Sequence, residues 1–201
     1  MSEASIHVRN RPLVLGSTSP YRRDLLSRLK LPFVTAAPEV DETPRPNESP
    51  LELARRLALA KARAVAALFP EAVVIGSDQV ADLAGESLGK PGTHAKATVQ
   101  LRRMRGQTVI FQTAVAVVCA ASGFEQLEVA PVRVTFRNLS DAEIESYLRA
   151  EQPYDCAGSA RSEGLGIALL EAIDSDDPTA LVGLPLIRTC RMIRAAGVKV
   201  L

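Results

Sequence analysis

Tryptophan is absent from this 201-residue sequence and aromatic residues make up only 4% of it, so aliphatic side chains must fill the core. An excess of one charge is also missing, because 24 basic residues nearly balance 23 acidic ones and leave a net charge of +1. A near-neutral protein has no global field that would hold duplex nucleic acid or an anionic membrane. We therefore expect no nucleic-acid and no membrane partner. Any phosphate binding must come from a few placed cations, which favours a small phosphorylated ligand over a polymer.

Cysteine is scarce, and its three residues lie far apart without any Cys-x-x-Cys pair. That pattern lacks the usual zinc-site spacing and does not suit a disulfide framework, so a reducing compartment fits best. The longest apolar run, Ala114 to Ala121, is too short to cross a bilayer, and the polar stretch 1–11 does not resemble a signal peptide. We therefore predict a cytoplasmic protein in which residues 1–11 form a ragged N-terminal extension.

Histidine is nearly absent as well, with only His7 and His94 in the chain. His7 falls in the polar N-terminal stretch, and the two residues do not form a catalytic pair. A Ser-His-Asp or Cys-His mechanism is therefore poorly supported. Carboxylate chemistry assisted by a divalent cation is what the remaining residues leave open.

Hydrophobic residues make up 47% of the chain and charged residues 23%, which is the balance of an ordinary globular protein. Helices are predicted where a Ser or Thr N-cap precedes apolar residues at helical spacing, and strands where short apolar runs lie between turn residues. The predicted helices follow Ser19, Ser49 (to about Leu68), Thr93 (to about Arg103) and Ser140 (to about Ala150), with a last helix at 185–195. The predicted strands are 12–16, 32–36, 72–80, 107–119, 124–136 and 168–173, with a loop or short strand at 179–184. The runs 107–119 and 124–136 predict a long antiparallel hairpin, so the expected class is mixed α/β.

Two polar segments in the first quarter of the chain are candidates for ligand binding. Residues 17–23, Ser-Thr-Ser-Pro-Tyr-Arg-Arg, lie between a predicted strand and a predicted helix. Helix-terminal N–H groups, hydroxyls and an arginine make a natural anion site, although a plain N-cap with solvent-facing arginines would look the same. Residues 39–42, Glu-Val-Asp-Glu, place carboxylates on a loop. Such oxygen ligands suit a hard cation such as Mg2+, and the alternative is a solvated acidic loop.

A third candidate is Asp78, at the end of an apolar run that predicts a strand buried on both faces. A carboxylate there is costly unless it is paired, hydrogen-bonded or bound to metal, and Gln79 adds a second polar group. Ligand sites in α/β sheets favour strand ends, although an aspartate that caps a turn is the alternative. Lys61 and Lys90, taken alone, resemble surface lysines. The glycines of 156–164 would let the backbone approach a ligand closely, or simply form a loop.

Six short motifs are specific in combination. They are Ser-Thr-Ser-Pro-x-Arg-Arg (17–23), Glu-Val-Asp-Glu (39–42), Ala-Lys-Ala (60–62), Gly-Ser-Asp-Gln-Val (76–80), Gly-Lys-Pro (89–91) and Gly-Leu-Pro-Leu (183–186). Together they resemble the Maf family, whose members hydrolyse nucleoside triphosphates to the monophosphate and pyrophosphate. The resemblance covers Leu13 to about Gly197. It implies a single Maf-like domain over 1–201, an elongated mixed sheet with flanking helices and two lobes around a cleft, as in inosine triphosphatases. Dimers are common in the family, so a homodimer is an open expectation.

The resemblance also implies a role for individual residues. Asp78 would accept the proton of the attacking water and lie at a divalent metal ion, Mg2+ or Mn2+, together with Asp41 and Glu42. The residues expected to contact the triphosphate are Ser17, Ser19, Arg22, Lys61 and Lys90. The residues expected to set base specificity are Tyr21, Gln79 and Glu163.

Three places resemble the 7-methyl-GTP pyrophosphatase subgroup in particular: Gln79, the stretch 156–159 (Cys-Ala-Gly-Ser), and Glu163. The dTTP/UTP subgroup has Thr in place of Gln79 and Gln in place of Glu163. A carboxylate accepts both donors of a guanine edge and favours the cationic methylated base. The ring of Tyr21 would add a cation–π interaction of about 0.5–2 kcal/mol. The expected reaction is metal-assisted attack of water on the α-phosphate of 7-methyl-GTP, which yields 7-methyl-GMP and diphosphate and removes modified nucleotides from the pool.

Two alternatives stay open at the level of the sequence. One is the same chemistry on dTTP, UTP or another modified nucleotide. The other is a non-enzymatic regulator of cell division, acting in septum formation through protein contacts. The joint presence of Asp41, Lys61, Asp78 and Lys90 favours an enzyme, because a binding module does not need that full set.

Overall fold

A mixed sheet of seven strands forms the centre of the computed structural model, which describes residues 11–201. The strands are β1 (Leu13–Gly16), β2 (Val34–Ala36), β3 (Val73–Leu83), β4 (Glu86–Leu88), β5 (Thr108–Cys119), β6 (Phe124–Phe136) and β7 (Leu170–Asp174). The helices are α1 (Pro20–Ser27), α2 (Pro50–Leu68), α3 (His94–Met104), α4 (Asp141–Glu151) and α5 (Leu186–Ala195). The strand order is β2-β1-β3-β5-β6-β7, with β4 paired to β3. β1 pairs in parallel with β2 and β3, and the remaining pairs are antiparallel. The predicted mixed α/β fold is therefore confirmed.

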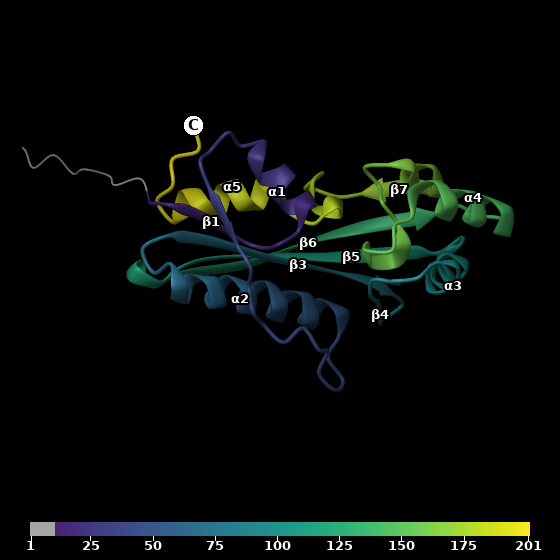
Figure 1. The fold of residues 1–201 in the computed structure, drawn as a ribbon, viewed down its shortest axis with the longest axis horizontal. Helices are drawn as coiled ribbons and strands as arrows, with labels where there is room; N and C mark the ends of the chain where they lie inside the picture. Colours follow the sequence, from purple (N-terminus) through teal and green to yellow (C-terminus); the bar gives the residue numbers. More distant parts are fainter. Residues whose placement is uncertain (1–10) are drawn as a thin grey trace, which may run out of the picture.

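Helices cover both faces of the half of the sheet that contains β1. Figure 1 shows α1 and α5 on one side of the strands and α2 on the other. The side chains of β1 alternate between these layers: Leu13 and Leu15 pack with α1 and α5, whereas Val14 packs with α2. This alternation follows from the two-residue period of a strand. It explains why β1 and the start of β3 have unbroken apolar sequences, as predicted for strands buried on both faces.

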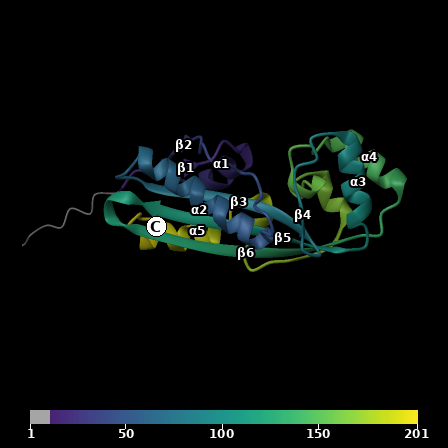
Figure 2. The ribbon, with the colours of Figure 1, turned by 90° about the horizontal axis from the view of Figure 1, so that it is seen from below.

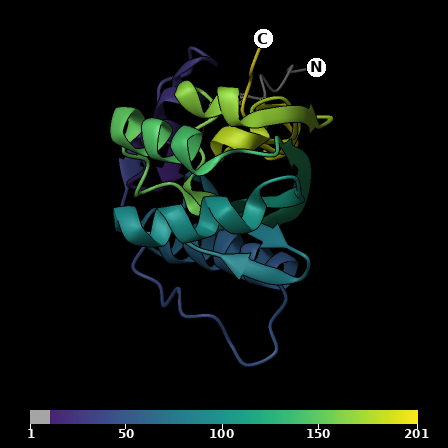
Figure 3. The ribbon, with the colours of Figure 1, turned by 90° about the vertical axis from the view of Figure 1, so that its right-hand side faces the viewer.

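The long hairpin of β5 and β6 carries the sheet to a second packing region. Its pairing runs from Thr108 opposite Thr135 to Cys119 opposite Phe124, which confirms the predicted hairpin. At the far end the strands pack with α3 and α4 in a separate apolar cluster. Figure 2 shows the elongated outline, with α3 and α4 at the end opposite α1 and α5, and Figure 3 looks along the sheet from that end. The prediction of one domain with two lobes stays a prediction.

The N-cap residues correctly predicted where the helices begin. Ser49 with Glu52 and Ser140 with Glu143 both form the predicted capping boxes, in which each side chain satisfies a backbone N–H of the other residue. The strand predictions were less accurate. The short strand β4 was not predicted, and the strand predicted at 168–173 is Leu170–Asp174, preceded by a 3-10 turn. Of the two alternatives for 179–184, the loop is correct, with a 3-10 turn at Ala180–Val182.

The N-terminal expectations fall mostly outside the part of the chain that the structure describes. Of the predicted extension 1–11, only Arg11 is described, and His7 is not. Within residues 11–201, no helix has both the length and the hydropathy that a membrane crossing requires.

Small residues let α2 lie unusually close to β3. A Cβ atom on Gly76 would be 2.4 Å from the carbonyl oxygen of Ala58 and 2.5 Å from the backbone nitrogen of Ala62. These are backbone atoms of the helix, which side-chain rotation cannot move away. The close approach places Lys61 of α2 directly over Asp78, two residues beyond Gly76 on the strand.

We expect Gly76→Ala to lower the free energy of unfolding by about 3 kcal/mol, because overpacking against a rigid partner falls at the upper end of the usual cost. Gly16→Ala is the matched control: its Cβ would be 3.2 Å from a methyl group of Val65 and 3.3 Å from the carbonyl oxygen of Ile75, contacts that are tight without overlapping, and we expect a loss of about 1 kcal/mol. Urea denaturation of both variants measures the difference. Equal stabilities would show that α2 retreats from β3 without strain.

Candidate active site

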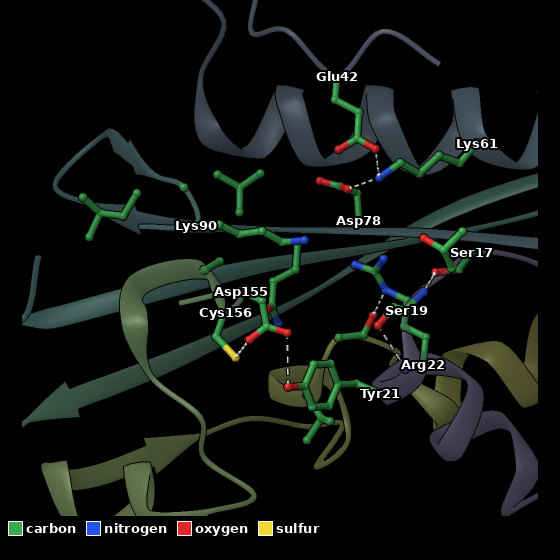
Figure 4. A pocket seen from close by; sticks show the side chains of 18 of the residues that line it. Ser17, Ser19, Tyr21, Arg22, Glu42, Lys61, Asp78, Lys90, Asp155 and Cys156 are labelled. Atoms are coloured by element: carbon green, nitrogen blue, oxygen red, sulfur yellow. Dashed lines mark hydrogen bonds and ion pairs between the residues drawn. The ribbon is translucent and has the colours of Figure 1, made fainter. Parts of the chain in front are cut away.

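One cleft of about 630 Å3 gathers residues from seven separate parts of the chain. The start of α1 with the segment before it, the loop before α2, helix α2, strand β3, residues 87–90, the loop after α4 and residues 182–183 all contribute, and Figure 4 shows many of their side chains. The predicted site residues that line it are Ser17, Ser19, Tyr21, Arg22, Glu42, Lys61, Asp78, Gln79, Lys90 and Glu163. Of the predicted set, only Asp41 does not line the cleft. Ser17 and Glu163, which are 146 positions apart in the chain, thus line the same cleft.

A buried ion-pair chain lies at the floor of the cleft. Lys61 Nζ donates to Asp78 Oδ1 at 2.7 Å and is 2.9 Å from Glu42 Oε1. The side chains of Lys61 and Asp78 are almost fully buried, whereas that of Glu42 is 59% exposed. The helix supplies the cation, the strand supplies one carboxylate and the loop supplies the other. A buried charge pair of this kind costs desolvation energy, so its retention points to a use beyond stability.

The environment of Asp78 favours proton acceptance. Burial raises the pKa of its carboxyl above the ordinary value, while Lys61 and Arg22 act in the opposite direction. Since Oδ1 accepts from Lys61, Oδ2 is the oxygen available to an incoming group. A carboxylate with a raised pKa beside a binding cleft is a candidate general base.

The start of α1 forms the second wall. Ser19 caps the helix by accepting from the backbone N–H of Arg22 at 3.4 Å, and Ser17 accepts from the N–H of Ser19 at 3.1 Å. The guanidinium of Arg22 donates through Nε to the carbonyl of Gly183 at 2.9 Å, which holds the side chain in the cleft wall. Burial lowers the pKa of Arg22, with the carboxylates of Asp78 and Glu42 acting against that shift, and an arginine stays charged regardless. Helix N–H groups, hydroxyls and this cation suit an anionic ligand.

Lys90 brings a further cation to the cleft from the segment between β4 and α3. Its side chain reaches toward the floor in Figure 4, and no ion pair holds it elsewhere within residues 11–201. The carbonyl of the preceding Gly89 accepts from Gln100 at 2.9 Å and from the N–H of Gly158 at 3.4 Å. The backbone beside Lys90 is therefore tied both to α3 and to the loop after α4.

Aromatic and acidic side chains form the other end of the cleft. The hydroxyl of Tyr21 donates to Asp155 at 3.4 Å, and burial, with Cys156 and Asp155 nearby, raises the pKa of Tyr21 to about 12. The guanidinium carbon of Arg161 lies 5.5 Å from the centroid of the Tyr21 ring, and its Nε is 3.5 Å from Glu163. The ring of Tyr21 and the carboxylate of Glu163 thus both interact with the positive charge of Arg161.

Gln79 closes the cleft between these two ends. Its Nε2 donates to Thr113 at 2.8 Å and to the carbonyls of Ala180 and Leu181 at 3.0 Å each. The amide nitrogen thus fixes the wall at 180–182. The amide oxygen is the atom left to accept a hydrogen bond from a ligand.

The structure separates the two acidic residues that the sequence left equivalent. The carboxylate of Asp41 is exposed and accepts from the backbone N–H of Thr43 at 2.9 Å, whereas Glu42 reaches Lys61. The metal-ligand role predicted for Asp41 stays a prediction. The sequence analysis missed Asp155, which lines the cleft beside Tyr21. Its position directly before the Cys-Ala-Gly-Ser stretch was the available signal.

The residues at the floor fit a divalent cation of the Mg2+ type. Within residues 11–201, no three His, Cys, Asp or Glu side chains gather as a complete metal cage. Glu42 and Asp78, however, are both held against the same Lys61 nitrogen. Mg2+ is usually bound through one or two carboxylates together with substrate phosphates, so this pair matches that chemistry.

Comparison with known proteins assigns the family. The family model described as "Maf-like protein" matches residues 12–196. A protein of Polaromonas sp. named 7-methyl-GTP pyrophosphatase is 79% identical over 94% of this chain and 86% of its own length. Proteins with the same name from Albidiferax ferrireducens and Aromatoleum aromaticum are 72% and 63% identical, over 95% and 94% of this chain and 96% and 98% of theirs. This chain belongs to the Maf family.

Proposed function

We propose that this protein hydrolyses 7-methyl-GTP to 7-methyl-GMP and diphosphate, with a divalent cation, and so removes methylated nucleotides from the pool. The observation that carries the proposal is the polarity of the cleft. Cations gather around Asp78 at one end, and at the other the carboxylates of Asp155 and Glu163 lie by the ring of Tyr21, where Arg161 now takes the place of a cation. A nucleotide with a cationic base matches both ends if its base replaces the guanidinium of Arg161 over the ring. The names of the relatives support the same reaction.

At the phosphate end, the residues of the chain account for the chemistry. Oδ2 of Asp78 accepts a proton as water attacks the α-phosphorus, the bond to the bridging oxygen breaks, and diphosphate leaves. Lys61, Lys90 and Arg22 neutralise charge that develops on the phosphate oxygens, and such electrostatic stabilisation contributes most of the rate enhancement in phosphoryl transfer. A divalent cation at Glu42 and Asp78 would add charge neutralisation and lower the pKa of water. No covalent nucleophile is needed.

At the base end, recognition depends on charge and hydrogen-bond direction. The carboxylate of Glu163 accepts the N1–H and amino donors of guanine, and the oxygen of Gln79 offers a further acceptor. Methylation at N7 makes the base cationic, which favours both Glu163 and the face of Tyr21. Uracil and thymine present carbonyls to a carboxylate and are disfavoured.

A panel of nucleoside triphosphates with Mg2+ or Mn2+ tests this proposal directly. We expect 7-methyl-GTP to give the highest kcat/KM among 7-methyl-GTP, GTP, dTTP and UTP, with 7-methyl-GMP and diphosphate as products. A preference for the pyrimidine triphosphates would overturn the substrate assignment and leave the reaction class intact.

Removal of the cation tests the metal requirement separately. We expect EDTA to abolish turnover and added Mn2+ or Mg2+ to restore it, because a divalent cation at Glu42 and Asp78 would neutralise phosphate charge and lower the pKa of the attacking water. Full turnover in metal-free protein would contradict the mechanism.

A cytoplasmic location and a homodimer remain part of the proposal. A nucleotide substrate places the enzyme where the nucleotide pool is. Light scattering of the purified protein measures the oligomeric state, and a mass near the 21.5 kDa of one chain would exclude a stable dimer.

A further inference from the structure

The segment that delivers Glu42 to the cleft has no regular structure of its own. Residues 37–48 form neither helix nor strand, and the side chains of 41–47 are exposed. A loop of this kind does not fix the direction of one long side chain by itself. Yet Glu42 reaches Lys61 at 2.9 Å. Something outside the loop must therefore hold its backbone in place.

Arg56 of α2 binds the C-terminal end of this loop. Its guanidinium forms a two-pronged pair with Glu48: Nε donates to Oε1 at 2.5 Å and Nη2 donates to Oε2 at 2.8 Å. Glu48 in turn accepts from the backbone N–H of Arg45 at 3.0 Å. The side chains of Arg56 and Glu48 are 19% and 8% exposed, so this pair is shielded from water. Such two-pronged pairs give geometric definition as well as energy.

The same guanidinium also holds the backbone on both sides of Glu42. Nη2 donates to the carbonyl of Thr43 at 3.0 Å, and Nη1 donates to the carbonyl of Asp41 at 3.5 Å. Glu42 lies between these two anchored residues. Because Arg56 and Lys61 belong to one helix, the anchor and the target of Glu42 have a fixed separation. A lysine at position 56 would carry the charge without the planar fork that reaches all these acceptors.

We propose that Arg56 is a positioning residue for the active site, which holds the loop 41–48 so that Glu42 is presented with Asp78 to the divalent cation. Arg56 does not line the cleft and touches no reacting group. Its hydrogen bonds reach Glu48 and the carbonyls of Asp41 and Thr43, the residues on either side of Glu42. This inference deepens the proposed function, because it rests on the role of Glu42 in that function.

Binding of Mn2+ alone, measured by electron paramagnetic resonance of the free ion, tests this role without turnover. We expect Arg56→Gln to weaken Mn2+ binding about 10-fold, the lower end of the effect of residues that orient metal ligands. Glu48→Gln breaks the other half of the fork and leaves Arg56 in place, and it should have a similar effect. Arg56→Lys should fall between the wild type and Arg56→Gln. Arg55→Gln is the matched control, since Arg55 is an exposed arginine on the same helix, outside the cleft, and should bind Mn2+ as the wild type does.

A double-variant cycle separates positioning from general loss of stability. If Arg56 acts through Glu42, then Glu42→Gln with Arg56→Gln binds Mn2+ as weakly as Glu42→Gln alone. The inference is overturned if Arg56→Gln weakens Mn2+ binding as much in the Glu42→Gln background as in the wild type. It is also overturned if either single variant binds Mn2+ with wild-type affinity.

Hydrogen exchange of the metal-free protein gives a second readout that does not require a metal or a substrate. We expect the amides of Thr43, Arg45 and Glu48, which are hydrogen-bonded within this loop, to exchange faster in Arg56→Gln, with those of β3 unchanged. Unchanged exchange at these three amides would overturn the anchoring role. A protein that passes these tests and fails to hydrolyse 7-methyl-GTP would refute the proposed function and leave the role of Arg56 standing.

Discussion

Asp78→Asn is expected to lower kcat for 7-methyl-GTP by about two to four orders of magnitude, the usual contribution of a positioned proton acceptor. The substitution keeps the size and shape of the side chain, and its amide oxygen can still accept from Lys61, as Oδ1 of Asp78 does at 2.7 Å. What disappears is the oxygen that can accept a proton from water, together with one charge facing the divalent cation. Initial rates over a series of Mn2+ concentrations measure the effect. A loss of kcat that persists at saturating Mn2+ assigns the proton-transfer role to Asp78.

Asp82→Asn is the matched control for this experiment. Asp82 lies on the same strand, and its carboxylate accepts from the backbone N–H of Gly85 at 2.8 Å, outside the cleft. We expect its kcat to stay near that of the wild type. An Asp78→Asn enzyme that retained normal kcat would remove Asp78 from the mechanism.

Asp78→Asn is also expected to change the thermal stability of the protein. Burial raises the pKa of Asp78 in the folded protein, so the folded state binds its proton more readily than the unfolded chain does. The ionised carboxylate of Asp78 therefore lowers the stability of the folded protein at neutral pH. This penalty decreases as the pH falls through the raised pKa of the folded state, and it is absent below the aspartate pKa of the unfolded chain, about 3.9. Asp78→Asn should melt no lower than the wild type at pH 7. A clearly lower Tm would show that the pair with Lys61 outweighs the cost of burial.

The second large effect is expected at Glu163. Glu163→Gln should lower the ratio of kcat/KM for 7-methyl-GTP over GTP by about 10- to 100-fold, since the attraction between a carboxylate and a unit charge about 6–10 Å away is about 1.5–3 kcal/mol at an effective dielectric constant of about 20, and each 1.4 kcal/mol is tenfold. The two substrates differ only in one methyl group and one positive charge. Their ratio therefore reports the electrostatic preference of the base end and cancels any general damage to the phosphate end.

Glu171→Gln provides the control for this ratio. Glu171 is an exposed glutamate on β7 and does not line the cleft. Its variant should keep the wild-type ratio. The assignment of Glu163 fails if Glu163→Gln also keeps that ratio, and Asp155, the second carboxylate beside Tyr21, would then be the residue to replace next.

Much of the local structure could be predicted because its causes are local. The boxes at Ser49 and Ser140 depend on residues three positions apart, and the hairpin of β5 and β6 depends on two apolar runs and a short turn. Strand β4 could not be predicted, because three residues are too few to show a periodic pattern. They form a strand because they pair with the end of β3, which extends to Leu83.

By itself, the sequence determined which residue types are available for the chemistry. Asp78, Lys61, Lys90 and Glu163 were recognised from motifs, and the tertiary structure brings them to one cleft. Only the tertiary structure shows that Glu42 reaches Lys61 whereas Asp41 bonds to Thr43, because the direction of a side chain on an irregular loop depends on distant contacts. Here that contact is the fork of Arg56, which anchors the carbonyls on either side of Glu42. The close packing of Gly76 on α2 likewise places Lys61 over Asp78, and no local pattern encodes that distance.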